Sequence, residues 1–299
     1  MDSAIIPKGA KRCPFPVFAT GIAVRMAAPL ISSKLTDPAI VVVDDRAFHA
    51  ISLLSGHLGG ANELTVEVAQ ITGASPVITT ATDINRLPSI DMVAKRLNLL
   101  IENPEMIKKV NMAFLQGKRV MLIDPFNLLA SYIPEQFRYK ELSDAGDAVT
   151  VLCSDTDIDI ERTKTLLLRP PSLVAGMGCN RGTARSELME ILISTFKEQN
   201  LSIKSLAAIA TTSLKQDEAG LIELAHELGK PIRFYDKDEL NSVETIENPS
   251  EMVEKHIGVK SVCEAAAILA TQNGVLIVPK IKKGNATLAV ARITVKNQV

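Results

Sequence analysis

The feature that most limits the fold is the stretch from Ile51 to Ile71, ISLLSGHLGGANELTVEVAQI. Before it, Phe48 to Leu54 has the apolar, β-compatible composition of a strand that ends at Ser55-Gly56. After the glycines, apolar residues recur at helical spacing: Ala61, Leu64, Val68 and Ile71. The sequence therefore predicts a strand, a glycine-rich turn and a helix in direct succession.

The turn has the composition of an anion-binding corner. Gly56, Gly59 and Gly60 lack a Cβ, so the backbone can take positive φ and approach a ligand closely. The first N–H groups of the following helix are expected to be unpaired and to carry the positive end of its dipole. Such a corner suits a carboxylate or a developing oxyanion.

His57 lies inside this corner, next to Asn62 and Glu63. A single histidine is often only structural or exposed, and that alternative stays open. Its near-neutral pKa and its polar neighbours also fit a group that transfers protons.

Composition excludes several classes of protein. The chain of 299 residues has 33 basic and 34 acidic residues, a net charge of −1 and 4% aromatic residues, so it offers no basic or stacking surface for nucleic acid. Four cysteines without a CxxC pair predict neither a disulfide framework nor a zinc site. No HExxH or GxSxG motif occurs, and no protein-held catalytic metal is expected.

The first residues imitate part of a signal peptide, with Lys8, Lys11 and Arg12 before an apolar run. Pro14 and Pro16 inside that run argue against export, so we expect a cytoplasmic protein. No run approaches the ~20 apolar residues that a membrane span needs.

We expect an α/β fold of two parallel or mixed-sheet domains joined by a smaller intermediate module. The predicted boundaries are 1–86, 87–169 and 170–299, with the second boundary at the stiff Arg169-Pro170-Pro171-Ser172 segment. In the first domain, strands at 39–43 and 75–80 flank the Ile51–Ile71 stretch and predict parallel pairing. A helix near the start carries Ile22, Met26 and Leu30 on one side.

The intermediate module is predicted to hold helices at 90–100 and 104–115 and a strand at 119–123. In the last domain, a strand at 173–175 enters the glycine-rich segment GMGCNRGT, 176–183, before a helix whose buried side carries Ala184 and Leu188. Asp217 is expected to cap a later helix, and Ser261 with Glu264 forms a capping-box pattern. A hairpin is predicted to close the domain at 275–294.

Neither glycine-rich segment matches a nucleotide fingerprint, because GMGCNRGT lacks the third glycine and no GxxxxGK[ST] occurs. Four cations fall near predicted element ends: Arg25, Arg181, Lys215 and Lys280. Each could be ordinary surface charge, and Arg181 between glycines is the best candidate for carboxylate recognition. Glu218 and Glu264 also have structural explanations, at helix N-termini.

Several motifs resemble the CbiG family, the cobalt-precorrin-5A hydrolases of anaerobic cobalamin biosynthesis. They are TGIAVR at 20–25, DPAIVVVD at 37–44, LLSGHLGGANEL at 53–64, VITTATD at 77–83, GMGCNRGT at 176–183, the stretch 209–232 and GVKSVCEAAAILA at 258–270. The last three resemble the carboxy-terminal domain that the family shares with CobE-type proteins. Relatives usually carry a further strand and helix before TGIAVR, so the amino-terminal domain is expected to be shortened.

The resemblance implies hydrolysis of the ring-A δ-lactone of cobalt-precorrin-5A, with loss of acetaldehyde, to give cobalt-precorrin-5B. Cobalt would come with the substrate, so no cofactor of the protein is expected. The implied partners are cobalt-precorrin-5A and, transiently, neighbouring enzymes of the corrin pathway.

We expect His57, oriented by Glu63 or Asn62, to activate water, and the Gly59 and Gly60 N–H groups to hold the oxyanion. Both glycine-rich corners would face one cleft that holds the polyacidic ring. The predicted substrate contacts are Gly21, Arg25, Lys34, Ser55, Gly59, Gly60, Thr80, Asp83, Gly178, Arg181, Gly182, Thr183, Lys215, Glu264 and Lys280.

Two other functions stay open. A non-catalytic protein that binds or hands over a tetrapyrrole would bind the macrocycle without releasing acetaldehyde. A phosphate-ester or nucleotide enzyme that uses both corners would bind nucleotide saturably.

Overall fold

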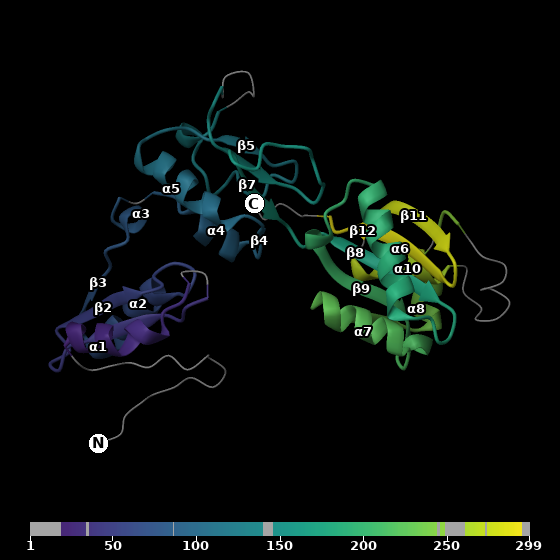
Figure 1. The fold of residues 1–299 in the computed structure, drawn as a ribbon, viewed down its shortest axis with the longest axis horizontal. Helices are drawn as coiled ribbons and strands as arrows, with labels where there is room; N and C mark the ends of the chain where they lie inside the picture. Colours follow the sequence, from purple (N-terminus) through teal and green to yellow (C-terminus); the bar gives the residue numbers. More distant parts are fainter. Residues whose placement is uncertain are drawn as a thin grey trace. The chain divides into compact units, whose positions relative to one another are not determined.

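The computed structural model describes residues 19–33, 36–85, 87–139, 146–243, 246–248, 261–272 and 274–294. The chain divides into two compact units, each of which is described by itself (Figure 1). Unit 1 comprises Met1–Arg96, Pro104–Met121 and Ser131–Thr150. Unit 2 comprises Leu97–Asn103, Leu122–Ala130 and Val151–Val299. No helix in the described ranges is long and apolar enough to cross a membrane.

The sheet of unit 1 has three strands in the order β1 (Ile40–Val43), β2 (His49–Leu54) and β3 (Ser75–Val77). β2 and β3 are parallel, as the strand-helix-strand order predicts, whereas β1 and β2 are antiparallel. α2 (Ala61–Thr72) connects the parallel pair and packs Val68 and Ala69 against it. The sheet is therefore mixed, and α/β is the observed fold class.

The apolar stripe predicted on α2 is partly wrong, because Ile71 is 73% exposed. The helix turns a different face inward, made of Ala61, Asn62, Thr65, Val68 and Ala69. The two polar residues on this face are both hydrogen-bonded, Asn62 to Ser52, Thr80 and Asp83, and Thr65 to the Ala61 carbonyl oxygen, which offsets the cost of burying them.

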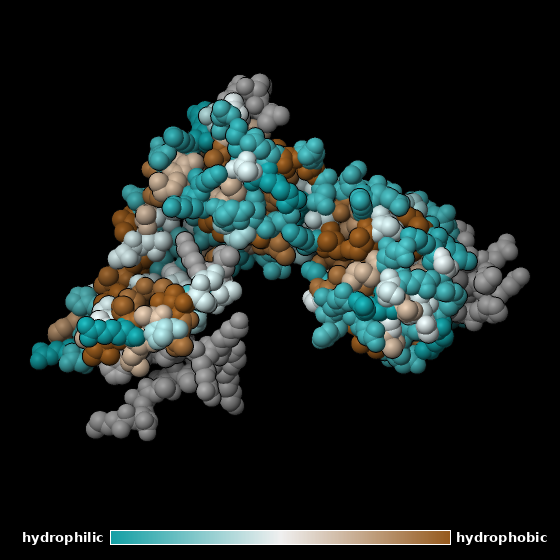
Figure 2. Space-filling model, viewed as in Figure 1, coloured by the Kyte–Doolittle hydropathy of each residue, from teal (hydrophilic) through white to brown (hydrophobic). Residues whose placement is uncertain are grey.

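α1 (Thr20–Ala27) and the short helix η1 (Ala28–Leu30) expose apolar side chains. Ile22, Met26 and Leu30 were predicted to share one side of a single helix, but Leu30 lies in η1 and all three side chains are exposed. Only Ala23 of α1 is buried. Figure 2 shows this apolar surface. A groove beside it is lined by Ala23, Met26, Ala27, Leu30, Ile31, Asp37, Pro38, Ile40 and Leu54.

The rest of unit 1 is built of short helices: α3 (Ala81–Ile84), α4 (Ile90–Arg96), η2 (Pro104–Met106), α5 (Ile107–Leu115) and η3 (Glu135–Phe137). α4 is shorter than predicted, and Asn98 just after it has a left-handed φ of 53°. The predicted helix at 104–115 is observed as the 3-10 helix η2 followed directly by α5. Phe114 of α5 meets Phe137 edge to face at 5.5 Å between ring centroids.

Unit 2 contains a five-stranded sheet covered by helices on both faces. Its order is β10 (Ile232–Tyr235), β9 (Leu206–Thr212), β8 (Leu173–Cys179), β12 (Ala286–Arg292) and β11 (Val275–Lys283). β8, β9 and β10 are parallel, and β11 and β12 form the predicted antiparallel hairpin.

The covering helices are α6 (Arg185–Glu198), α7 (Ala219–Leu228), α8 (Lys237–Asn241) and α10 (Val262–Ala270), and the short helices η5 (Ile203–Ser205) and η6 (Ser213–Lys215) connect them to the strands. α6 and α7 pack on the face that carries Leu173 and Met177, whereas α8 and α10 pack on the face that carries Val174. This alternation along β8 makes three layers.

A second sheet has the order β4 (Leu100–Ile101), β7 (Thr165–Arg169), β6 (Thr150–Cys153) and β5 (Met121–Ile123). The buried Arg169 at the end of β7 binds Glu102 at 2.7 Å and Asp157 at 2.7 Å. Burial raises the pKa of Glu102, but hydrogen bonds from Arg162 and Arg169 outweigh it and lower that pKa to about 2.

Four local predictions in unit 2 are wrong. Gly176 and Gly178 belong to β8, where they pair with Ala289 and Thr287 of β12. α10 lies so close to the strand that a Cβ on Gly176 would collide with the Cys263 carbonyl oxygen. Glu218, not Asp217, is the residue before α7. Ser261 precedes α10 without a side-chain capping bond, because Glu264 is bonded elsewhere. The predicted Ala184 is exposed, whereas Leu188 is buried.

Candidate functional site

The candidate site begins where β2 ends and the chain turns into α2. The turn wraps back on itself: the N–H groups of Ala61 and Asn62 donate to the carbonyl oxygens of Ser55 and Gly56 at 3.1 and 3.0 Å. The Gly60 N–H donates to the His57 carbonyl oxygen at 2.9 Å. The expectation of unpaired N–H groups at the start of α2 is therefore wrong, and Gly60 has no N–H to offer an oxyanion.

Two glycines in the turn are required by close packing. A Cβ on Gly56 would lie 2.7 Å from Asn62 Oδ1, and a Cβ on Gly59 would lie 2.8 Å from the Ser55 carbonyl oxygen. Gly60 has a φ of 88°, in the left-handed region. The glycines thus shape the turn and leave room for Asn62.

Ser55 has two signs of strain. Its φ is 57°, which is uncommon outside glycine, and its buried hydroxyl finds no hydrogen-bond partner within the described part of the chain. Strain of this kind persists where surrounding structure enforces it and is frequent at functional sites.

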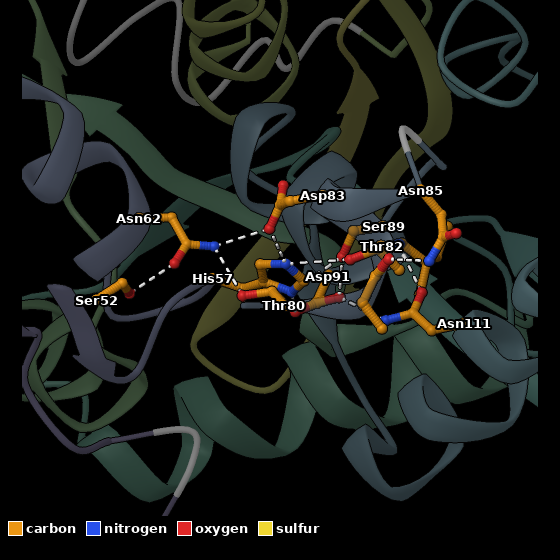
Figure 3. Close-up of polar contacts among 12 residues, drawn as sticks. Ser52, His57, Asn62, Thr80, Thr82, Asp83, Asn85, Ser89, Asp91 and Asn111 are labelled. Carbon is orange, nitrogen blue, oxygen red and sulfur yellow. Dashed lines mark hydrogen bonds and ion pairs between the residues drawn. The ribbon is translucent and has the colours of Figure 1, made fainter. Parts of the chain in front are cut away.

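His57 is buried, with 6% of its side chain exposed, and both ring nitrogens face carboxylates. Nδ1 lies 3.1 Å from Asp91 Oδ2, and Nε2 lies 3.0 Å from Asp83 Oδ2 (Figure 3). The hydroxyls of Ser89 and Thr82 lie 3.1 and 3.2 Å from the same two nitrogens. The ring is therefore fixed on both sides.

The electrostatics favour a protonated imidazole. The hydrogen bond with Asp91 raises the pKa of His57 above its ordinary value, against the effect of burial, and Asp83 adds to the rise. Burial would raise the pKa of Asp91, but hydrogen bonds from His57, Ser89 and Asn111 hold it well below its usual range. As an imidazolium, His57 donates to one carboxylate from each nitrogen.

Asp91 is the buried anchor of this arrangement, with none of its side chain exposed. Its Oδ1 accepts from the Ser89 hydroxyl at 2.6 Å and from Asn111 Nδ2 at 2.9 Å. Asn111 in turn accepts the Ile90 N–H at 3.0 Å at the start of α4. α4 and α5 thus hold the carboxylate that holds the histidine.

Asp83 is the outer member, with 45% of its side chain exposed. Its Oδ2 also accepts from Asn62 Nδ2 at 2.8 Å. Asn62 Nδ2 contacts the Thr80 hydroxyl at 3.0 Å, and its Oδ1 accepts from the Ser52 hydroxyl at 2.6 Å. The structure thus brings together four of the residues chosen from the sequence: His57, Asn62, Thr80 and Asp83.

Glu63 does not orient His57. Its side chain is 65% exposed and lies 3.6 Å from Lys95 Nζ. Ser52, Thr82, Ser89, Asp91 and Asn111 were missed, since no spacing rule connects them to His57. The one sequence signal is an aspartate just after Pro88-Ser89, where a helix begins, and that pattern usually marks an exposed cap.

The second glycine-rich corner, between β8 and α6 in unit 2, already contains an anion of the chain itself. The Gly182 N–H donates to Glu218 Oε1 at 2.7 Å, and Lys215 Nζ lies 3.1 Å from Glu218 Oε2. Burial alone would raise the pKa of Glu218, but Lys215 and the Gly182 N–H lower it. Arg181 binds Asp217 at 2.5 Å and the Leu214 carbonyl oxygen at 2.9 Å.

The other residues predicted to contact the substrate make hydrogen bonds within the fold, are exposed elsewhere, or lie outside the described residues. Glu264 is fully buried and accepts from the Glu247, Asn248 and Lys280 N–H groups. Thr183 donates to the Asn180 carbonyl oxygen within its loop, and Thr287 donates to the Gly178 carbonyl oxygen. Gly21 and Arg25 are exposed on α1, and Lys34 lies outside the described residues.

The two corners lie in different compact units, so a cleft shared by them stays a prediction.

Three family models match successive parts of the chain. They are Cobalamin synthesis G N-terminal at residues 10–83, Cobalamin biosynthesis central region at 88–170 and Cobalamin synthesis G C-terminus at 173–291. These boundaries divide the chain differently from the compact units, since Asp91 of the central region contacts His57 of the amino-terminal region.

Curated relatives match over most of the chain. The protein named cobalt-precorrin-5A hydrolase from Priestia megaterium is 37% identical over 93% of this chain and 77% of its own length. The protein of the same name from Salmonella typhimurium is 38% identical over 86% of this chain and 76% of its own. Protein CobE from Sinorhizobium sp. is 31% identical over 40% of this chain and 79% of its own. With matching models for all three regions and these identities, the chain belongs to the cobalamin synthesis G (CbiG) family.

Proposed function

We propose that this protein is a hydrolase that converts cobalt-precorrin-5A to cobalt-precorrin-5B. The reaction opens the ring-A δ-lactone with water, and the ring-contraction carbon then leaves with its methyl group as acetaldehyde. The observation that carries the proposal is the similarity over most of the chain to two curated proteins that bear this activity as their name.

The site in unit 1 supports hydrolytic chemistry. Lactone opening requires a group that takes a proton from water and gives it to the leaving oxygen. An ionised Asp91, a buried His57 and a partly exposed Asp83 in contact are groups that can hold and orient such a proton. The loss of acetaldehyde then breaks a carbon-carbon bond in a retro-aldol step.

The substrate is a flat macrocycle rimmed by acetate and propionate groups, and its cobalt arrives with it. Basic residues are suited to these carboxylates. Arg25 on α1 and Arg181 and Lys215 in unit 2 are the candidates, together with Lys34. The pairing of Arg181 with Asp217 and of Lys215 with Glu218 means that a substrate carboxylate would compete with an existing partner.

The direct test is incubation of the purified full chain with cobalt-precorrin-5A, with acetaldehyde followed by a coupled dehydrogenase assay. We expect acetaldehyde in a 1:1 ratio to substrate consumed. Binding of cobalt-precorrin-5A without acetaldehyde would contradict the hydrolase and favour a protein that binds or hands over the intermediate.

A further inference from the structure

We propose that Asp83 is the catalytic residue that activates water, and that His57 is a positioning residue which holds Asp83 through its own contact with Asp91. This inference rests on the proposed function and changes the part that the sequence assigns to the histidine. The three groups form one series of contacts, Asp91 to His57 to Asp83 (Figure 3). The series leads from a fully buried carboxylate to a partly exposed one.

The exposed fraction of the side chain distinguishes these three residues. Asp91 has no exposed side chain, His57 has 6% and Asp83 has 45%. A group that takes a proton from water bound at the substrate must reach that water. Asp83 meets this condition, whereas the other two are covered.

The hydrogen bonds leave one atom of Asp83 for the reaction. Its Oδ2 accepts from His57 Nε2 and from Asn62 Nδ2. Within the described ranges no hydrogen bond reaches Oδ1, the other oxygen of the same carboxylate. Oδ1 is therefore the proton acceptor in this proposal, while Oδ2 fixes the plane and direction of the group.

His57 has no nitrogen left for water. Nδ1 faces Asp91 and Ser89, and Nε2 faces Asp83 and Thr82. The nearby cation is Lys95, whose Nζ lies 3.5 Å from the His57 carbonyl oxygen. The surroundings from α2, α3, α4 and α5 are thus two carboxylates, the Ser89 and Thr82 hydroxyls and the amides of Asn62 and Asn111, a setting that favours a cationic ring.

Asn62 fixes Asp83 from the second side, and its orientation is determined by its neighbours. The Ser52 hydroxyl donates to Oδ1 of the amide, so Nδ2 points to Asp83 and Thr80. A Cβ on Gly56 would lie 2.7 Å from the same amide oxygen. The glycine-rich turn therefore serves the carboxylate by making room for the amide that holds it.

The step balances as an ordinary ester hydrolysis. The water oxygen forms a bond to the lactone carbonyl carbon, and its proton moves to Asp83 Oδ1. The tetrahedral intermediate then collapses, the bond between the carbonyl carbon and the ring oxygen breaks, and the leaving oxygen takes the proton from Oδ1. The products are a carboxylic acid and an alcohol, and Asp83 returns to its ionised form.

The test compares Asp83→Asn and His57→Gln with the wild type in the acetaldehyde assay, with kcat and KM for cobalt-precorrin-5A measured from pH 5 to 9. Asp45→Asn is the matched control, since Asp45 is an exposed carboxylate in the turn between β1 and β2 of the same unit. Circular dichroism and thermal unfolding of each variant establish that it folds.

We expect Asp83→Asn to lower kcat by about 10²–10⁴-fold with little change in KM, which is the usual range for loss of a general base. His57→Gln should keep partial activity, with a smaller loss of kcat than Asp83→Asn and little change in KM, because Asn62 still holds Asp83 Oδ2. A histidine that served only the fold would lower thermal stability and leave the kcat of the folded protein unchanged.

An Asp83→Asn variant with near wild-type kcat would overturn the inference and leave the proposed function intact. Complete loss of activity in a folded His57→Gln variant, with Asp83→Asn active, would return the role of base to His57. If His57→Gln does not fold, the kcat of Asp83→Asn decides. A wild-type protein that binds cobalt-precorrin-5A but releases no acetaldehyde would overturn the proposed function and this inference together.

Discussion

The two glycine-rich corners of this protein have the same order of elements, a strand, a turn and a helix. They differ in the side chains that lie in them. In unit 1 the corner collects polar side chains from four helices and leaves Asp83 partly in solvent. In unit 2 the corner is filled by Glu218, which is 4% exposed and bonded to the Gly182 N–H. The first corner presents the Asp83 carboxylate to solvent. The second pairs its Gly182 N–H with a carboxylate of the same chain, Glu218.

The difference shows that a glycine-rich turn before a helix is not by itself an anion site. The N–H groups of such a turn attract any carboxylate, and the chain can supply one. In unit 1 the N–H groups of Gly60, Ala61 and Asn62 donate to carbonyl oxygens of the turn itself. What distinguishes the first corner is therefore the buried ion pair beneath it, not its backbone.

The largest expected effect is on that ion pair. Asp91→Ala should lower the free energy of unfolding by about 3–5 kcal/mol, because it leaves a cationic His57 buried without its main partner. Urea unfolding measures the change, and Asp45→Ala, an exposed site, should stay within about 0.5 kcal/mol. A loss below about 1 kcal/mol for Asp91→Ala would mean that the pair contributes no more than a surface contact.

Substitution of the glycines tests how tightly each corner is packed. Gly59→Ala should cost about 1–3 kcal/mol, because its Cβ would press on the Ser55 side chain and carbonyl oxygen. Gly182→Ala meets no atom within 4 Å and should cost about 1–2 kcal/mol from its φ of 75° alone. A greater loss of stability for Gly182→Ala than for Gly59→Ala would mean that the first corner is not the more tightly packed of the two.

The pH dependence of stability tests the charge on His57. Since its pKa is raised in the folded state, its contribution is fully present below the unfolded value of about 6.5 and is lost as pH rises through the folded value. The stability advantage of wild type over His57→Gln should therefore shrink as the pH rises above about 6.5. An advantage that grows with pH would contradict a cationic His57.

The smallest effect is expected at the surface of the second corner. Arg181→Ala should change stability by less than about 1 kcal/mol, because Arg181 and Asp217 are 62% and 75% exposed. Arg292→Ala provides the contrast in the same unit: it removes two contacts, at 2.8 and 3.0 Å, from the buried Asp155. Equal losses of stability in Arg181→Ala and Arg292→Ala would mean that the exposure of an ion pair does not determine its contribution to stability.

Much of the fold could be predicted from local patterns. The strand before the first turn, α2, α5, β10 and the closing hairpin follow from apolar periodicity and turn residues, since these are properties of neighbouring residues. Patterns failed where distant packing decides. Gly176 was predicted to lie in a turn, but it continues β8 because it pairs with Ala289 of β12 and Ala210 of β9. Ser261 and Glu264 were predicted to form a capping box, but they do not.

The family, the α/β class and the strand-turn-helix order around His57 could be predicted from local sequence patterns. The packing of distant elements fixes how the histidine is held: not by Glu63, six residues away in the chain, but by Asp91 from the following region and by Asp83. The reason is physical. Apolar periodicity reports which side of an element is buried, whereas a buried charge requires partners in three dimensions, and those come from wherever the packed helices happen to meet.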